Sequence, residues 1–136
     1  MLPDKHPLLE RAVLTPEDFR GQPFISLSAA DRYRQQIDQM FHQSGVMRRV
    51  IMETHSAAAV CAMVREGLGL AIVNPFTALD QLGTGMQIRR LSVPIPFVVS
   101  IVQPDHCPAS QFARIFLETL VKEAGRISAR LDHEAA

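Results

Sequence analysis

The sequence predicts an α/β fold built on a parallel sheet. First, β-prone runs at 23–28, 48–54 and 68–73 alternate with amphipathic helix patterns. Second, the connections between them are short, as in right-handed β-α-β crossovers. Third, the run LGLAIV at 68–73 is apolar without alternation, which is typical of a parallel strand covered on both faces.

Length and composition limit the classes of protein that the chain can represent. Its 136 residues, 47% of them hydrophobic, suffice for one domain with a core and argue against disorder. Lys plus Arg and Asp plus Glu balance at 14 each, so this chain is not expected to hold nucleic acid by itself. We find neither an apolar run of about 18 residues nor the apolar core of a secretory signal, which predicts no membrane segment and a cytoplasmic protein.

Residues 15–44 contain the first strand and its flanking helices. The stretch TPEDFRG predicts a helical turn in which Thr15 caps and Gly21 closes. Ser28 then opens a Ser-x-x-Asp box, which predicts a helix over 29–44 that ends before Gly45. The expected buried stripe of this helix is formed by Tyr33, Ile37, Met40 and Phe41.

The next unit runs from the strand at 48–54 to Gly83. Ser56 is the predicted cap of a helix that Gly67 ends, and Asn74 with Pro75 opens a short helix ending near Gly83. The glycines at 67 and 69 are expected to end a helix and to let backbones pass closely. The buried face of the longer helix is expected to be Ala57, Val60, Cys61 and Val64.

The C-terminal third has a different pattern. Two strand-like stretches within 86–104 are separated by Pro94 and Pro96, and 108–125 predicts an amphipathic helix stopped by Gly125 and followed by a frayed tail. The prolines make Leu91–Pro96 and Pro3–Pro16 candidate hinges. The apolar stripe of the final helix is Phe112, Ile115, Phe116, Thr119 and Leu120.

The carboxyl ends of the predicted strands gather polar side chains. In an open α/β sheet, ligands bind beyond these ends, and each is followed here by a helix N-terminus that favours a carboxylate. A small anionic or zwitterionic guest is therefore expected, although caps alone would also explain the serines and the asparagine. The candidate ligand-binding residues are Ser26, Ser28, Thr54, His55, Ser56 and Asn74.

Catalytic, metal and cofactor sites are not indicated. His55 and Ser56 are adjacent on a strand-to-helix corner, so their side chains diverge, and the chain has no nucleophile elbow or phosphate-binding glycine loop. The five histidines are scattered. Cys61 is expected in the core and Cys107 in a loop, as a reduced pair without a disulfide.

Three long stretches resemble the effector-binding domain of LysR-type transcriptional regulators. They are LPDKHPL (2–8), TPEDFRGQPFISLS (15–28) and VCAMVREGLGLAIVNP (60–75). The resemblance implies a type 2 periplasmic-binding-protein-like fold, in which 15–92 form a complete second lobe and the first lobe is partial. It assigns 1–14 to a remnant of the first lobe and hinge, 93–124 to a return strand and final helix, and 125–136 to a C-terminal tail.

The resemblance also implies a function and partners. An amino-acid-like effector such as diaminopimelate would bind between the lobes and control transcription connected with lysine biosynthesis. DNA would be bound only through an N-terminal winged helix-turn-helix, which this chain lacks, and 97–102 and 112–120 would be exposed apolar surfaces. The alternative is a ligand-free module that self-associates or joins a full-length subunit; a stand-alone enzyme and a transport binding protein are disfavoured.

Overall fold

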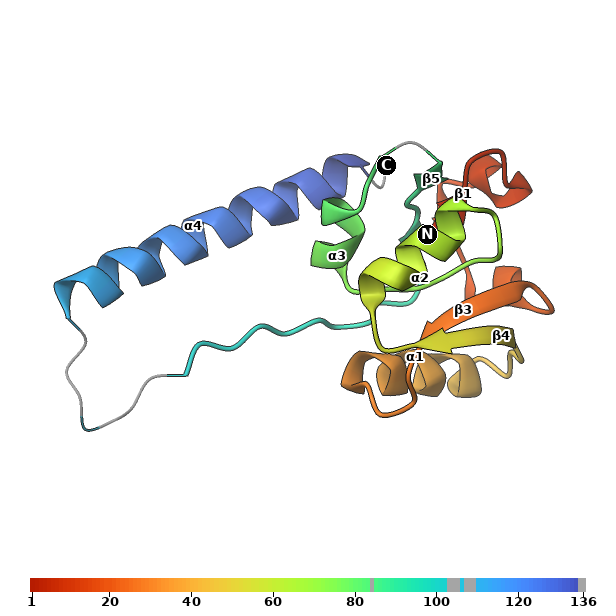
Figure 1. Cartoon of the computed structure of the whole chain (residues 1–136), viewed down its shortest axis with the longest axis horizontal. Helices are drawn as coiled ribbons and strands as arrows, with labels where there is room; N and C mark the ends of the chain where they lie inside the picture. The colour runs from red at the N-terminus through yellow and green to blue at the C-terminus, as the bar shows by residue number, and fades with distance from the viewer. Residues whose placement is uncertain (84, 103–105, 107–109, 135–136) are drawn as a thin grey trace. The chain divides into compact units, whose positions relative to one another are not determined.

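The computed structural model describes residues 1–83, 85–102, 106 and 110–134. They form two compact units, Met1–Phe97 and Val98–Glu134. Figure 1 shows the chain as a ribbon coloured from the N-terminus to the C-terminus. The described strands and the three shorter α-helices belong to the first unit, and the long helix α4 belongs to the second.

The first unit is built on a parallel pair of strands, β3 (Pro23–Leu27) and β4 (Arg49–Thr54). On the other side of β3, the Ile25 N–H donates to the Leu70 carbonyl, and the Leu70 N–H donates to the Pro23 carbonyl, both at 2.8 Å. This bridge is also parallel. The predicted parallel sheet and its β-α-β order are therefore confirmed.

The segment 68–73 is less regular than predicted. It makes one parallel bridge to β3, at Leu70, and then changes partner. The Met1 amine donates to the Ala71 carbonyl at 2.8 Å, and the Ala71 N–H donates to the Met1 carbonyl at 3.2 Å. Leu70, Ala71 and Val73 of this segment are buried, as expected, whereas Leu68 is exposed. The change of partner prevents a continuous ladder with β3.

The two segments predicted as hinges lie side by side. β2 (Val13–Leu14) pairs in parallel with β6 (Arg90–Leu91), and the Ser92 N–H extends this pairing with a 2.7 Å bond to the Leu14 carbonyl. Nearby, β1 (Leu2–Pro3) pairs antiparallel with β5 (Met86–Gln87). Residues early and late in the unit therefore join through two short pairs of strands.

Helices cover both faces of the β3–β4 pair, with α1 (Arg32–Gln43) on one side and α2 (Ala57–Arg65) on the other (Figure 1). Successive side chains of a strand point to opposite faces, so Phe24 joins the core under α1 and Ile25 the core under α2. The predicted buried face of α2 is confirmed at Val60, Cys61 and Val64, while Ala57 is partly buried.

The helical turn η2 (Pro16–Phe19) begins as predicted, and the shorter turn η1 (Pro7–Glu10) was not predicted. The Thr15 N–H donates to the Asp18 carboxylate at 2.7 Å, which fixes the start of η2. Gly21 follows it with a φ of 69°, a left-handed conformation that glycine adopts without strain.

The predicted cap of α1 at Ser28 is wrong. Asp31 caps this helix, since its carboxylate accepts from the Arg34 N–H at 2.9 Å. Ser28 is still held by the sheet, because its N–H donates to the Thr54 carbonyl at 3.0 Å. The helix therefore begins at Arg32, three residues later than the sequence predicted, and ends at Gln43 close to the expected position.

The glycines after α2 have the predicted roles. Gly67 follows the helix with a φ of 77°, so it supplies the left-handed residue of a helix end. A Cβ at Gly69 would lie 2.6 Å from the Pro23 carbonyl oxygen, which is a forbidden contact. Gly69 therefore lets segment 68–73 approach β3. The short helix α3 (Pro75–Asp80) then starts after Asn74, as predicted.

The described residues from 97 onward correct two predictions. No strand is present among the described residues of 97–102, since no neighbouring strand of the described chain supplies partners for this β-prone stretch. The final helix, α4 (Gln111–Glu134), continues through Gly125 instead of ending there. A single glycine costs a helix only about 1 kcal/mol, and good helix formers follow it. Cys107 lies outside the described residues.

The apolar surfaces expected from the sequence are exposed. Val98, Val99, Ile101 and Val102 are all exposed in the extended segment. On α4, the exposed large apolar side chains are Phe112, Ile115, Phe116, Leu120 and Val121. None of the helices in the described part of the chain is long and apolar enough to cross a membrane.

Candidate ligand-binding site

The carboxyl ends of β3 and β4 meet at one edge of the sheet. Leu27 pairs with Thr54 in the parallel register, and the Ser28 N–H bonds to the Thr54 carbonyl at 3.0 Å. Beyond the bridge between Phe24 and Leu70, both segments continue for four residues, one to Ser28 and the other to Asn74. The backbone thus brings the ends of three segments to the same edge.

The N-terminus of α2 adjoins this edge. The Ser56 hydroxyl accepts from the Ala59 N–H at 3.2 Å, and the Thr54 hydroxyl accepts from the Ser56 N–H at 3.2 Å. His55 and Ser56 are exposed, and Thr54 is partly buried. Because a helix leaves its first N–H groups without intrahelical partners, this start offers donors and a positive dipole end to a solvent-borne anion.

Asn74 has a capping role that uses both ends of its amide. Its Oδ1 accepts from the Thr77 N–H, and its Nδ2 donates to the Thr77 hydroxyl, each at 2.9 Å. The side chain is partly buried. Both contacts hold the amide at the start of α3. Asn74 therefore lies at the edge with both ends of its amide already engaged in capping.

Ser26 differs from the other five candidates, because it is only 2% exposed. It pairs with Glu53 across the sheet, so the two side chains point to the same face. Glu53 contacts Arg34 of α1, which identifies this as the face under α1. Ser26 is therefore enclosed beneath the helix and does not form part of the open edge.

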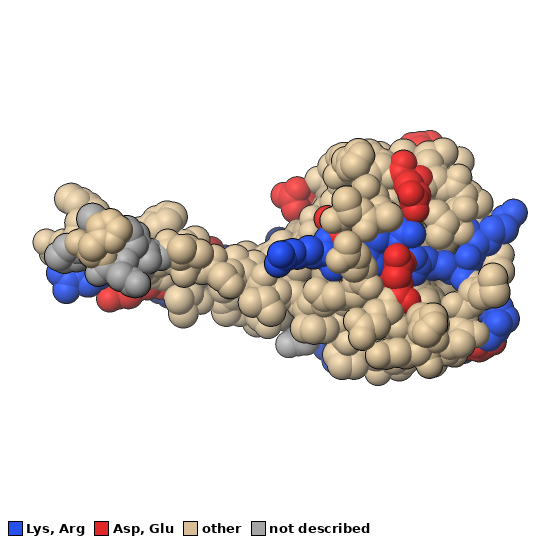
Figure 2. Space-filling model, turned by 90° about the horizontal axis from the view of Figure 1, so that it is seen from below, with Lys and Arg blue, Asp and Glu red and all other residues tan. Residues whose placement is uncertain are grey.

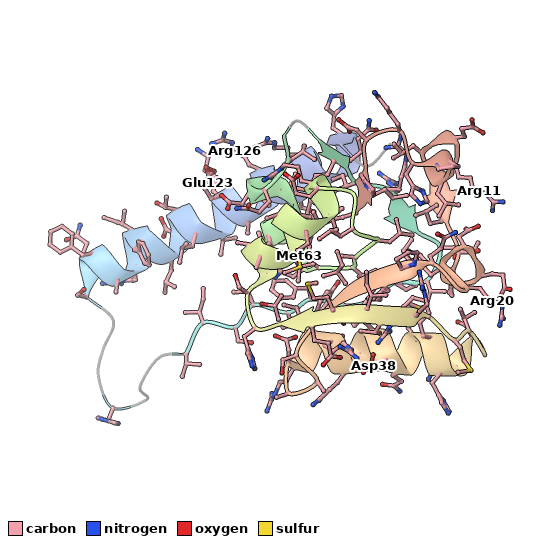
Figure 3. The ribbon with its side chains drawn as sticks, turned by 45° about the vertical axis from the view of Figure 1, so that its right-hand side comes forward. Arg11, Arg20, Asp38, Met63, Glu123 and Arg126 are labelled. Carbon is pink, nitrogen blue, oxygen red and sulfur yellow. The ribbon has the colours of Figure 1, made fainter. Side chains whose placement is uncertain are left out.

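An arginine that the sequence analysis did not single out holds this region together. The Arg34 guanidinium donates to the Leu27 carbonyl at 2.6 Å, to Glu53 at 2.8 Å and to Asp38 at 2.7 Å. Asp38 lies on α1 beside β4 (Figure 3). The spacing of Arg34 and Asp38 along a helix is a detectable sequence signal, whereas the contact with Glu53 depends on how α1 packs.

Three aromatic rings lie close to the same edge. Phe97 makes edge-to-face contacts with Tyr33 on α1 and with Phe76 on α3, at centroid separations of 5.5 and 5.6 Å. Burial raises the pKa of Tyr33. The sequence predicts Tyr33 only in a core stripe and Phe97 only in a strand, so it does not indicate this cluster. The three rings add an apolar surface near the polar edge of the sheet.

Fold and site together define a class of protein, an α/β domain whose strands end at a polar rim suited to a small ligand. The sequence matches the family model described as LysR substrate binding domain over residues 1–125. The chain therefore belongs to the LysR substrate-binding domain family.

Sequence relatives support the same assignment. The chain is 53% identical over 116 residues to the transcriptional activator protein LysR of Escherichia coli strain K12, covering 85% of this chain and 37% of that protein. It is 31% identical over 125 residues to the regulatory protein NocR of Agrobacterium tumefaciens strain T37, covering 88% and 41%. The chain thus spans about two fifths of the length of these relatives, both of which are named as regulators of transcription or regulatory proteins.

Solved structures share the fold. A LysR-family regulator from Pseudomonas aeruginosa aligns with a TM-score of 0.65 at 19% identity, over 91% of this chain and 43% of that one. The CcmR regulatory domain of Synechocystis PCC6803, in complex with 2-PG, aligns with a TM-score of 0.62 at 16% identity, over 88% and 58%. These neighbours confirm the predicted α/β fold of the periplasmic-binding-protein-like type.

Proposed function

We propose that this chain is the effector-sensing part of a cytoplasmic LysR-type transcriptional regulator. The observation that carries the proposal is the family match over 1–125 together with the polar edge formed by Ser28, Thr54 and the start of α2. A related domain of the same fold is known in complex with the small ligand 2-PG, which supports a small-molecule role. DNA binding would belong to a separate part of the regulator.

We propose that residues 15–92 form one lobe of this sensor, with 1–14 and 93–124 belonging to a hinge and a first lobe. The pairing of β2 with β6 supports a junction here, because it joins the two proline-rich segments. The described part of 125–136 is helical and continues α4.

The chemistry of the edge favours a zwitterionic amino acid such as diaminopimelate. Its carboxylate would lie at the start of α2, near Ser56, where the N–H groups and the helix dipole favour negative charge. Either the Ser28 hydroxyl or the Glu53 carboxylate would accept from its ammonium group, but Glu53 already accepts from Arg34. The Ser28 hydroxyl is therefore the preferred acceptor.

Titration by NMR tests this function. Diaminopimelate is expected to shift the amide resonances of residues 54–58 saturably, with a dissociation constant in the millimolar range because the edge is open to solvent. Lysine, which lacks the second carboxylate, is expected to cause smaller shifts. Ser28→Ala should weaken diaminopimelate binding about tenfold, the effect of losing roughly 1.4 kcal/mol.

Ser92→Ala is the matched control, because it removes an exposed hydroxyl beside β6 and should leave binding unchanged. Flat titrations with both amino acids would exclude this class of ligand.

A specific observation favours self-association as a second function. The edge of β4 that faces away from β3 has no partner strand among the described residues, and Val50, Ile51 and Met52 are 36%, 43% and 41% exposed. An open strand edge with apolar side chains is a template for pairing. A second chain could therefore dock along β4 and α1.

Sedimentation velocity over a wide concentration range tests the second function. Ile51→Lys is expected to weaken dimerisation at least tenfold, because it places a charge on the exposed strand. Leu68→Lys changes an equally exposed apolar residue outside β4 and should have no effect. A chain that stays monomeric at all concentrations would remove this function.

A further inference from the structure

A second side-chain cluster lies away from the polar edge, at the amino end of β4. Arg48 precedes this strand, and its side chain is only 8% exposed. The guanidinium lies over the rings of Phe24 and Phe41, at 4.9 and 4.7 Å from their centroids. Ser56 follows the other end of β4, so the backbone at Arg48 and the backbone at Ser56 are separated by the length of the strand, roughly 20 Å.

The Arg48 guanidinium is only partly neutralised. Its Nη2 bonds to the Asp38 carboxylate, which Arg34 also uses, whereas its Nε and Nη1 are buried without a hydrogen-bond partner. The aromatic rings interact with the face of the cation and leave these N–H donors unsatisfied. Burial, followed by the charge of Arg34, lowers the pKa of Arg48 to about 10.

A pocket of about 590 Å³ adjoins this cation. Its lining includes the charged residues Arg34, Asp38 and Arg48 and the apolar residues Val46, Met47 and Val50. This size lies in the range of small-molecule sites, which combine apolar walls with a few polar groups. Figure 2 shows the face on this side of the unit, where a band of basic side chains is interrupted by acidic ones.

We propose that this pocket binds a small monocarboxylate with an apolar body, whose carboxylate accepts from the free donors of Arg48. The two arginines already face Asp38 and Glu53, so the cluster is neutral overall, and it offers a guest unpaired N–H donors of Arg48 and no excess positive charge. A carboxylate supplies an acceptor for the unpaired donors, and an apolar body matches the apolar residues that line the pocket. Arg34 lines this pocket and also contacts Leu27 and Glu53 next to the effector edge, so the two sites share this residue, whereas Arg48 belongs to the pocket.

Benzoate is the probe, with benzyl alcohol as its uncharged counterpart, in a chloride buffer free of other carboxylates. Benzoate is expected to shift the amide resonances of residues 45–50 and the Nε–H resonance of Arg48 saturably, at millimolar concentration, and benzyl alcohol is not. Arg48→Met should weaken benzoate binding at least tenfold. Arg49→Met, the same change at an exposed neighbour, should leave it unchanged.

The wild-type Arg48 Nε–H resonance needs no variant, so the test holds even if Arg48→Met does not fold. An unmoved Nε–H resonance, or equal binding of benzyl alcohol, would overturn the proposal. If the Nε–H shift depends on protein concentration and not on benzoate, the donors are satisfied by a carboxylate of a second chain, and the small-molecule site is refuted.

Discussion

Replacing Phe24 by alanine is expected to lower the free energy of unfolding by about 3–5 kcal/mol, the usual cost of removing a buried phenylalanine. Phe24 is fully buried at the centre of the sheet. Its ring makes edge-to-face contacts with Phe19 and Phe41, with centroids 6.0 and 5.9 Å away. The substitution also removes one of the two rings that hold the Arg48 guanidinium.

In urea denaturation followed by circular dichroism, this loss lowers the urea concentration at the midpoint of unfolding. The slope of the unfolding free energy against urea concentration stays the same. Phe112→Ala is the matched control, because Phe112 is 84% exposed on α4 and its loss should change stability by less than about 0.5 kcal/mol. If Phe24→Ala is unfolded in water, Phe24→Leu keeps most of the apolar volume and gives a measurable, smaller loss. Equal effects at Phe24 and Phe112 would contradict the assigned core.

The order of strands and helices could be predicted because its signals are local. Ser56 caps α2 and Gly67 ends it through conformational preferences that need no distant contact. The start of α1 could not be predicted in the same way. Ser28 and Asp31 are both good caps, and the choice between them depends on the bond from Ser28 to Thr54, which forms only when β3 and β4 pair.

The C-terminal errors have a different origin. A β-prone sequence such as 97–102 becomes a strand only where a neighbouring strand supplies hydrogen bonds, and composition does not reveal that neighbour. The sequence predicts a helix end at Gly125, but a glycine ends a helix only where the backbone turns left-handed. Gly125 lies inside α4 and has no such conformation.

The sequence predicts where the candidate site lies, but not which of its side chains are enclosed or linked to one another. The rule that ligands bind beyond strand ends selected Ser28 and Thr54, which the structure brings together. It could not show that Ser26 is enclosed, since burial depends on the packing of α1. The link between Arg34 and Glu53 spans 19 residues and arises from the same packing, so no local pattern indicates it.

In a polypeptide that begins at Met1, stability is expected to rise steeply as the pH increases from about 5 to 8. The Met1 amine is completely buried, and desolvation lowers its pKa from 8.0 to about 5 in the folded state. Between these values the unfolded state binds the extra proton, so raising the pH favours folding. The difference of about three pKa units corresponds to at most about 4 kcal/mol, gained by pH 8 and absent below pH 5.

Acetylation of the N-terminus separates this effect from other titrations, because it removes the ionisable amine and leaves every side chain in place. Burial also lowers the pKa of His6, which gives a trend of the same sign in both forms. In urea denaturation, the unfolding free energy of the chain with a free amine should therefore rise more steeply with pH than that of the acetylated chain, by up to about 1.4 kcal/mol per pH unit. Identical pH dependence in the acetylated and free chains would show that the amine is solvated, and that its bond to the Ala71 carbonyl does not hold it in the core.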